Sequence, residues 1–83
     1  MNWGTHGPVN KPDRDILRQF GQAARRRRKA LGLSQERLAA LADLHRTYIA
    51  DVERGARNLS LLSIMKICRA MRTTPSRLMK GMQ

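Results

Sequence analysis

The chain has 83 residues and a formal net charge of +11, with 17 lysines and arginines against 6 acidic residues. This length allows for one small domain whose core is too modest to enclose a catalytic cleft, and no apolar run approaches a membrane span or a signal peptide. The lone Cys68 has no disulfide partner, so we expect a cytoplasmic protein whose positive charge favours a polyanionic partner.

The first predicted helix follows an N-terminal tail. Residues 1–12 are rich in glycine and proline and show no periodicity, so we expect them to be mobile. A long helix is predicted over residues 13–31, capped by Asp13 beside Pro12 and stopped by Gly32. Its residues at helical spacing form a stripe that should face the core: Leu17, Phe20, Gly21, Ala24 and Leu31.

Four arginines and a lysine lie near the end of this helix. Arg25, Arg26 and Lys29 point away from the apolar stripe, whereas Arg28 falls inside it. A buried arginine needs a partner, because an unpaired buried charge is strongly destabilising. Glu53, at the inward edge of a later helix, is the obvious candidate. We therefore predict an Arg28–Glu53 salt bridge that fixes the orientation of two helices more than it adds net stability.

Two short helices joined by a tight turn are predicted for residues 34–55. Ser34 is a good N-cap, and an apolar stripe follows it: Leu38, Ala39 and Ala42. The stripe breaks at residues 43–45, and a second one then begins: Ile49, Val52 and the arm of Glu53. Gly55 stands where a helix commonly ends in a left-handed residue. This is the geometry that places a second helix in a DNA major groove.

Two more helices are predicted after a polar connection. Ser60 caps the first, whose apolar face comprises Leu61, Ile64, Ile67, Cys68 and Met71. Thr74 and Pro75 are a strong start signal for a short fifth helix over residues 76–80, which carries Leu78 and Met79. With no strand signal and no internal repeat, the fold class is all-α: a compact five-helix helix-turn-helix domain over residues 13–83.

The excess positive charge lies outside the central helix pair. Residues 34–58 carry four acidic and four basic side chains, whereas residues 13–33 and 59–83 each carry a net charge of +5. Phosphate contacts position a protein on DNA, and base contacts specify the sequence. We therefore expect the flanks to supply long-range attraction and the central pair to read bases.

The second helix of the pair presents a polar face opposite its apolar stripe. The candidate base-reading residues on or beside that face are Arg46, Thr47, Tyr48, Ala50 and Asp51. Arg46 stands at the N-terminal end, where its planar fork matches guanine O6 and N7, with a phosphate contact as the alternative. For Tyr48 the alternative to a DNA contact is a half-buried position in the core. Asp51 either accepts from a cytosine amino group or, as we favour, braces Arg46 or Arg54.

Candidate phosphate contacts flank this helix. They are Gln35, Arg54, Arg57 and Asn58. Gln35 begins the first helix of the pair, whose N-terminus adds partial positive charge. The tail offers only Lys11 and His6 as cations, so an arm that reaches DNA is the lesser alternative there.

These residues match a known pattern. GLSQ at residues 32–35, LA at 38–39, YI at 48–49 and ERG at 53–55 closely resemble the Cro and phage-repressor (Xre-type) helix-turn-helix domains. The resemblance covers roughly residues 13–79. It implies five helices, a dimer and sequence-specific DNA binding, and it maps the family's arginine–glutamate pair onto Arg28 and Glu53.

A narrower resemblance lies in HRTYI at residues 45–49 and ERGARNLSL at residues 53–61, which are similar to the controller proteins of restriction–modification systems. That family implies a small dimer that regulates its own and the endonuclease promoters, with Arg46, Thr47 and Tyr48 reading the operator. Asp43 departs from the pattern by replacing the usual turn glycine, which aspartate can do in the left-handed region. The twelve-residue tail and the RRRRK run at residues 25–29 are also not typical.

We therefore expect a homodimeric transcription regulator on a near-palindromic operator, with half-sites roughly 10 bp apart. The predicted dimer surface consists of Leu62, Met65, Met79 and Met82, and the alternative is that these are scattered surface apolar residues. Activation would need a surface for RNA polymerase, for which Asp51 and Glu53 are poor candidates. No second domain offers a site for a small-molecule effector.

Two other functions compete with this one. An antitoxin would bind a toxin protein and repress its own operon, but no extra interaction segment follows the fifth helix. A general nucleic-acid or coactivator module would use the arginine run and show weak sequence preference with a steep salt dependence. We expect no bound metal, because His6, His45 and Cys68 lack metal-ligand spacing. We expect neither an enzyme nor a cofactor, because no nucleophile–base pair or phosphate loop occurs in the sequence.

Overall fold

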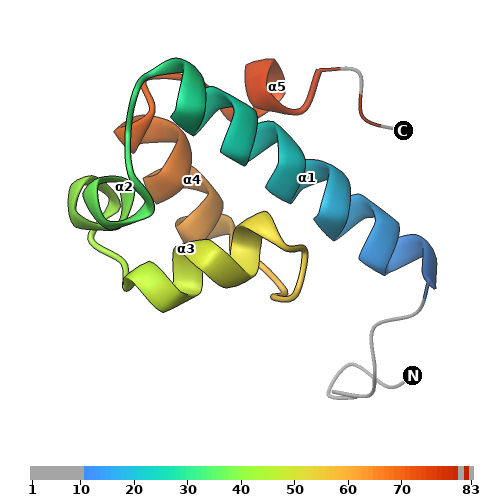
Figure 1. The fold of residues 1–83 in the computed structure, drawn as a ribbon. Helices are drawn as coiled ribbons and strands as arrows, with labels where there is room; N and C mark the ends of the chain where they lie inside the picture. Colours follow the sequence, from blue (N-terminus) through green and yellow to red (C-terminus); the bar gives the residue numbers. More distant parts are fainter. Residues whose placement is uncertain (1–10, 81, 83) are drawn as a thin grey trace.

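Five helices make up the described part of the chain, residues 11–80 and 82, in this computed structural model (Figure 1). In chain order they are α1 (Lys11–Ala30), α2 (Gln35–Ala42), α3 (Arg46–Glu53), α4 (Leu61–Ala70) and α5 (Pro75–Leu78). The described residues contain no strand, and none of their helices is long and apolar enough to cross a membrane. The predicted all-α class with five helices is confirmed.

The start of α1 differs from the prediction. The helix begins at Lys11 and includes Pro12, two residues of the predicted tail, and Asp13 lies in its first turn instead of capping it. Proline is tolerated there because the first turn of a helix leaves its N–H groups without intrahelical partners. The rest of the predicted tail, residues 1–10, lies outside the described residues.

The predicted capping signals for the other helices are largely present. The hydroxyls of Ser34, Ser60 and Thr74 accept hydrogen bonds from backbone N–H groups three residues later, at 3.0, 3.0 and 3.2 Å. Each bond satisfies a donor that the first turn would otherwise leave open. Pro75 follows as the first residue of α5, which ends at Leu78, two residues earlier than predicted.

Two leucines expected in the core are exposed. Leu31 is 39 % exposed because α1 ends at Ala30, so the helical phase that placed Leu31 on the core stripe no longer applies to it. Leu61 is 75 % exposed. It is the first residue of α4, and helical side chains lean back toward the N-terminus, beyond the packed part of the helix.

The core forms where the first four helices meet. Its buried cluster comprises Phe20, Ala24, Leu38, Ala39, Ile49, Val52, Ile67 and Met71. A fully buried side chain such as Leu38 or Ile49 contributes roughly 1.5–3 kcal/mol to folding. Cys68 is buried beside this cluster, and burial raises the pKa of its thiol. α1 and α2 pack against α3, and α4 packs against α2, so the helices around the core fix how α3 is presented.

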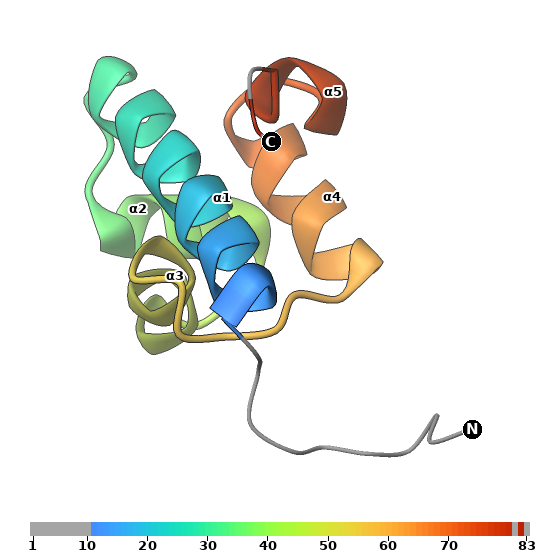
Figure 2. The same ribbon diagram turned by 90° about the vertical axis from the view of Figure 1, so that its right-hand side faces the viewer.

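The backbone of α1 lies directly against the end of α3. A Cβ atom on Gly21 would stand only 2.2 Å from the carbonyl oxygen of Val52, so only glycine allows this approach. Just beyond α3, Gly55 adopts a left-handed φ of 72°, and a Cβ there would lie 2.7 Å from the Cα of Arg18. Figure 2 shows the result: α3 lies on one side of α1, and α4 and α5 lie on the other.

Candidate nucleic-acid interface

The turn between α2 and α3 depends on Asp43. This residue has φ 57° and ψ 49°, the left-handed conformation that the sequence predicted in place of the usual glycine. The N–H groups of Asp43 and Leu44 donate back to the carbonyls of Ala40 and Ala39 at 3.3 and 2.9 Å, which closes the end of α2. The Asp43 carboxylate also lies 3.9 Å from the ammonium of Lys66 on α4.

α3 has one buried side and one outward side. Its buried residues are Ile49, Val52 and Glu53. Arg46 and Thr47 in its first turn are exposed, whereas Tyr48, Ala50 and Asp51 are partly buried. The N-cap position, His45, makes no side-chain cap hydrogen bond. The first turn of α3 therefore presents an arginine, a threonine and open backbone N–H groups on the surface.

Arg28 and Glu53 form a bidentate ion pair inside the protein. The Nε and Nη2 atoms of Arg28 donate to the two carboxylate oxygens of Glu53 at 2.6 and 2.9 Å, and both residues are only 8 % exposed. The Nη1 atom of Arg28 donates to the carbonyl of Leu33 at 2.8 Å. The pair thus joins the end of α1, the α1–α2 connection and the end of α3 through one guanidinium group.

The charge state of Glu53 follows from these contacts. Burial alone would raise its pKa, but hydrogen bonds from Arg28 and Gln35 and the positive charges of Arg28 and Arg25 hold the pKa below its usual value. The hydrogen bond to Glu53 likewise raises the pKa of Arg28 against the opposing effect of burial. Both groups therefore stay ionised over the ordinary pH range.

A chain of hydrogen bonds connects this pair to the surface. Gln35 donates from its amide nitrogen to Glu53 at 3.1 Å and accepts from the Nη1 atom of Arg46 at 3.3 Å. The Nε atom of Arg46 also lies 3.8 Å from the carboxylate of Glu36, although the Arg46 side chain remains 54 % exposed. Sequence reasoning placed Gln35 on phosphate and missed this bridge. One of its amide protons is used here, and the second remains for an outside partner.

A second cluster surrounds Asp51 on the outward side of α3. Its carboxylate accepts from Arg54 and, at 3.1 Å, from Arg57, and these hydrogen bonds lower the pKa of Asp51. The guanidinium of Arg57 also lies over the Tyr48 ring, 4.8 Å from its centroid. Asp51 therefore braces Arg54 as we favoured from sequence, and it braces Arg57 instead of Arg46. Tyr48 packs against the core, as its alternative interpretation had it.

The residues proposed for the dimer surface differ in exposure. Leu62 is 59 % exposed, and its neighbour Leu61 is still more open. Met65 is partly buried, and Met79 and Met82 are partly buried against the protein's own core. The two leucines at the start of α4 therefore offer more free apolar surface than the methionines, and Leu61 was assigned to the core by the helical phase of α4.

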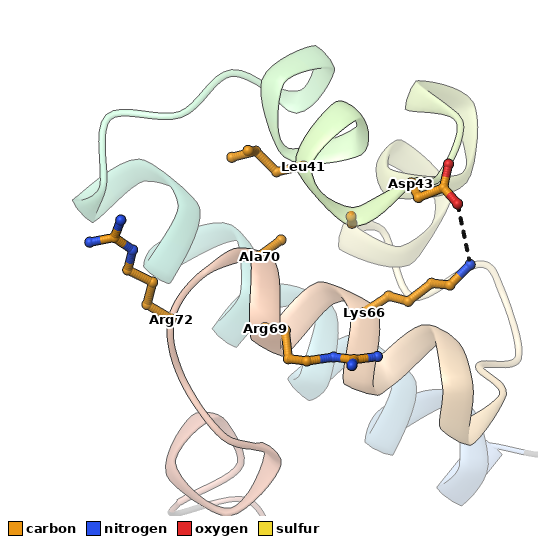
Figure 3. Close-up of a pocket in the computed structure, with 7 residues that line it drawn as sticks. Leu41, Asp43, Lys66, Arg69, Ala70 and Arg72 are labelled. Carbon is orange, nitrogen blue, oxygen red and sulfur yellow. Dashed lines mark ion pairs between the residues drawn. The ribbon is translucent and has the colours of Figure 1, made fainter.

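A hollow with a cavity volume of about 390 Å³ lies between α2 and α4 (Figure 3). Leu41 and Ala70 line it together with Lys66, Arg69 and Arg72, and the Lys66–Asp43 ion pair closes one end. Its rim is basic and lacks a nucleophile–base pair. Among the described residues no group of three His, Cys, Asp or Glu side chains is placed to hold a metal ion.

Comparison with known proteins identifies the fold family. Residues 25–78 match the family model for helix-turn-helix proteins. Control protein C.BamHI from Bacillus amyloliquefaciens is 51 % identical over 61 residues, which cover 72 % of this chain and 75 % of that protein. The chain belongs to the helix-turn-helix control proteins.

Solved structures of control proteins agree with this membership. The restriction–modification controller protein C.AhdI from Aeromonas hydrophila has 50 % sequence identity and a TM-score of 0.73, covering 75 % of this chain and 94 % of that one. A tetramer of the controller protein C.Esp1396I in complex with its natural 35 base-pair operator has 29 % identity and a TM-score of 0.73, covering 78 % and 86 % of the two chains. As a control protein the chain is a DNA-binding transcription regulator, and this result favours the regulator over the antitoxin.

Proposed function

We propose that the protein is a restriction–modification controller that binds, as a homodimer, a near-palindromic operator upstream of its own gene. The observation that carries the proposal is the exposed Arg46 at the start of α3, connected through Gln35 to the buried Arg28–Glu53 pair. A base-reading side chain needs a fixed position, because a guanine is distinguished by two hydrogen bonds of defined geometry. The operator complex of C.Esp1396I, a relative, supports this function.

Each outward residue of α3 has a role in this proposal. Arg46 reads a guanine, and Thr47, exposed beside it, donates to a base or packs its methyl group on thymine. Ala50 is small enough to let the helix approach the groove closely. Asp51 acts indirectly, since two arginines already occupy its carboxylate.

The phosphate contacts come from both ends of the helix pair. Arg54 and Arg57 are exposed beyond α3, where Asp51 and the Tyr48 ring hold them in place, and Asn58 is exposed beside them. Gln35 offers its remaining amide proton together with the N-terminus of α2. These contacts fix the position of the protein on DNA without selecting a sequence.

The homodimer uses the exposed start of α4. Leu61 and Leu62 are adjacent large apolar residues that are 75 % and 59 % exposed. In a two-fold symmetric dimer the same patch meets itself, so one apolar patch per chain is sufficient. Met65 lies one turn further along α4 and is partly buried, whereas Met79 and Met82 pack against the protein's own core and would add little to the patch.

A gel shift on the DNA immediately upstream of this gene tests the proposal. At physiological salt we expect a discrete complex at nanomolar protein that scrambled competitor DNA of the same length does not remove. The Arg46→Ala variant, at the same concentration, should lose most of this complex. Equal removal by operator and scrambled competitor would show that the protein does not read this sequence.

A further inference from the structure

The RRRRK run at residues 25–29 places its neighbouring arginines on different sides of α1. Arg27 points to the end of α4, where its Nε donates to the carbonyl of Met71 at 3.1 Å and its Nη2 donates to that of Arg72 at 3.3 Å. Arg28 points to α3 and pairs with Glu53. Both side chains hold helices together, so neither is available to a ligand.

Arg25 and Arg26 are both exposed, but as consecutive residues of α1 they point about 100° apart around the helix. Arg26 lines a small hollow beside α5, together with Leu78 and Lys80. Arg25 lies one helical turn after Gly21, where α1 meets the end of α3, and its charge helps to lower the pKa of Glu53. Figure 2 shows α3 on one side of α1 and α5 on the other.

Arg25 belongs to a row of arginines along α1. Arg14, Arg18 and Arg25 follow at spacings of four and seven residues, which keeps them within about 40° of one another around the helix. All three are exposed. The row runs beside the contact at Gly21, where the backbone of α1 meets the end of α3, and beside the contact of Gly55 with the backbone of Arg18.

The acidic side chains of α3 already have arginine partners, so they are not available to pair with the arginines of this row. The two acidic residues of α3 are Asp51 and Glu53, and each carboxylate is paired with arginine side chains from its own surroundings. The row therefore keeps its charge beside the end of α3 and Gly55, next in the chain to the exposed Arg54. A basic row that continues from a groove-reading helix lies where the flanking phosphates of the duplex pass.

We propose that Arg14, Arg18 and Arg25 form a second phosphate-binding row, which holds the DNA backbone outside the half-site read by α3. The row rests on the proposed function, because it extends the same interface. Through Arg25, the row gives the arginine run at residues 25–29 a direct phosphate contact in addition to its long-range attraction to DNA. It also predicts that the DNA needed for full affinity is longer than the sequence that α3 reads.

Arg25→Ala and Arg26→Ala form a matched pair that tests this row. They are adjacent exposed positions, and each variant removes one positive charge from the same helix. Fluorescence anisotropy would measure the affinity of each variant for the upstream DNA fragment between 50 and 200 mM salt. A lost phosphate contact makes the logarithmic salt slope shallower by about 0.9, which corresponds to about 3.5-fold in affinity over this range. We expect that change for Arg25→Ala and for Arg18→Ala, and a clearly smaller one for Arg26→Ala.

Equal salt slopes for Arg25→Ala and Arg26→Ala would overturn the phosphate-binding row. Thermal melts of all variants should show that the fold is kept, because each substitution is at an exposed helical position. A second arm compares a fragment ending at the half-sites with one extended by 10 bp on each side. The wild-type protein should gain affinity on the longer fragment, and the triple variant at Arg14, Arg18 and Arg25 should not.

The two proposals fail in different ways. Wild-type protein that binds operator and scrambled DNA equally would contradict the proposed operator function. The comparison of Arg25→Ala with Arg26→Ala can still be made on that scrambled DNA, where the same difference in salt slope would support the phosphate-binding row and its absence would refute it.

Discussion

Glu53 is the residue on which the position of α3 most depends. Its carboxylate accepts hydrogen bonds from the side chains of both Arg28 and Gln35. Replacing it with alanine leaves Arg28 buried without its counter-charge. We expect Glu53→Ala to lower the free energy of unfolding by about 3–5 kcal/mol, measured by urea denaturation. Glu36→Ala is the control: its side chain is 74 % exposed, so a change within about 0.5 kcal/mol is expected. An unchanged unfolding midpoint in Glu53→Ala would contradict the role of the ion pair.

The same carboxylate makes stability depend on pH. Because its folded-state pKa is lowered, the unfolded chain binds more protons near the usual glutamate pKa of about 4.3. The stabilisation is therefore fully present above that pH and is lost as the pH falls through the lowered pKa. We expect the unfolding free energy of the wild type to fall below about pH 4.3, and Glu53→Gln to show a shallower fall. Parallel pH profiles for the two proteins would contradict this assignment.

Arg46 and Arg57 should differ in how they affect sequence preference. Arg46→Ala should cost about 1–3 kcal/mol and relax preference at one base position, whereas Arg57→Ala should weaken binding to all sequences alike. A panel of operators with single base changes, tested by competition against both variants, separates these effects. Uniform loss across the panel for Arg46→Ala would show that it contacts phosphate only.

Some side-chain contacts of this site follow from helical phase, and others depend on how the helices pack. The pairing of Arg28 with Glu53 was predictable, because helical phase put both charges on inward faces and each required a partner. The bridge through Gln35 and the contact of Arg57 with Tyr48 were not. Both join side chains that are several residues apart and on different elements, and their positions depend on how the helices pack.

At the scale of helices, local signals were sufficient for most boundaries. Capping hydroxyls act within one turn, so Ser34 and Ser60 could be predicted from their neighbours alone, whereas the left-handed Asp43 was predicted from the glycine that the family has at that position. Burial was harder to predict at helix ends. Leu31 and Leu61 have the right periodicity, but whether another helix covers them is a matter of tertiary packing.

The crossing of α1 and α3 depends on Gly21. Gly21→Ala would gain about 0.5–1 kcal/mol of helix propensity, but its Cβ would stand 2.2 Å from the carbonyl oxygen of Val52. The backbone of Val52 cannot move aside as a flexible side chain can. The cost of overpacking, typically about 1–3 kcal/mol, should therefore exceed the gain in helix propensity. We expect a lower thermal midpoint for Gly21→Ala and no fall for Gln22→Ala, its exposed neighbour. Equal midpoints would show that the two helices can separate without cost.

For the whole molecule, the central expectation is a two-fold dimer. Leu62→Glu would place a charge in the proposed apolar interface and should raise the dimer dissociation constant at least about tenfold, or about 1.4 kcal/mol, by analytical ultracentrifugation. Leu41→Glu is the matched control, since Leu41 is 47 % exposed but lies in the hollow between α2 and α4. A similar loss of dimer in both variants would place the interface elsewhere.

Hydroxyl-radical footprinting of the upstream DNA tests the dimeric, base-reading helix pair most directly. Two protected half-sites related by a two-fold axis are expected, with centres about 10 bp apart, because that spacing returns the major groove to the same face of the duplex. Protection should disappear from both half-sites together as protein is diluted. A single unsymmetric protected segment, or uniform protection without boundaries, would contradict a homodimer that reads its operator through α3.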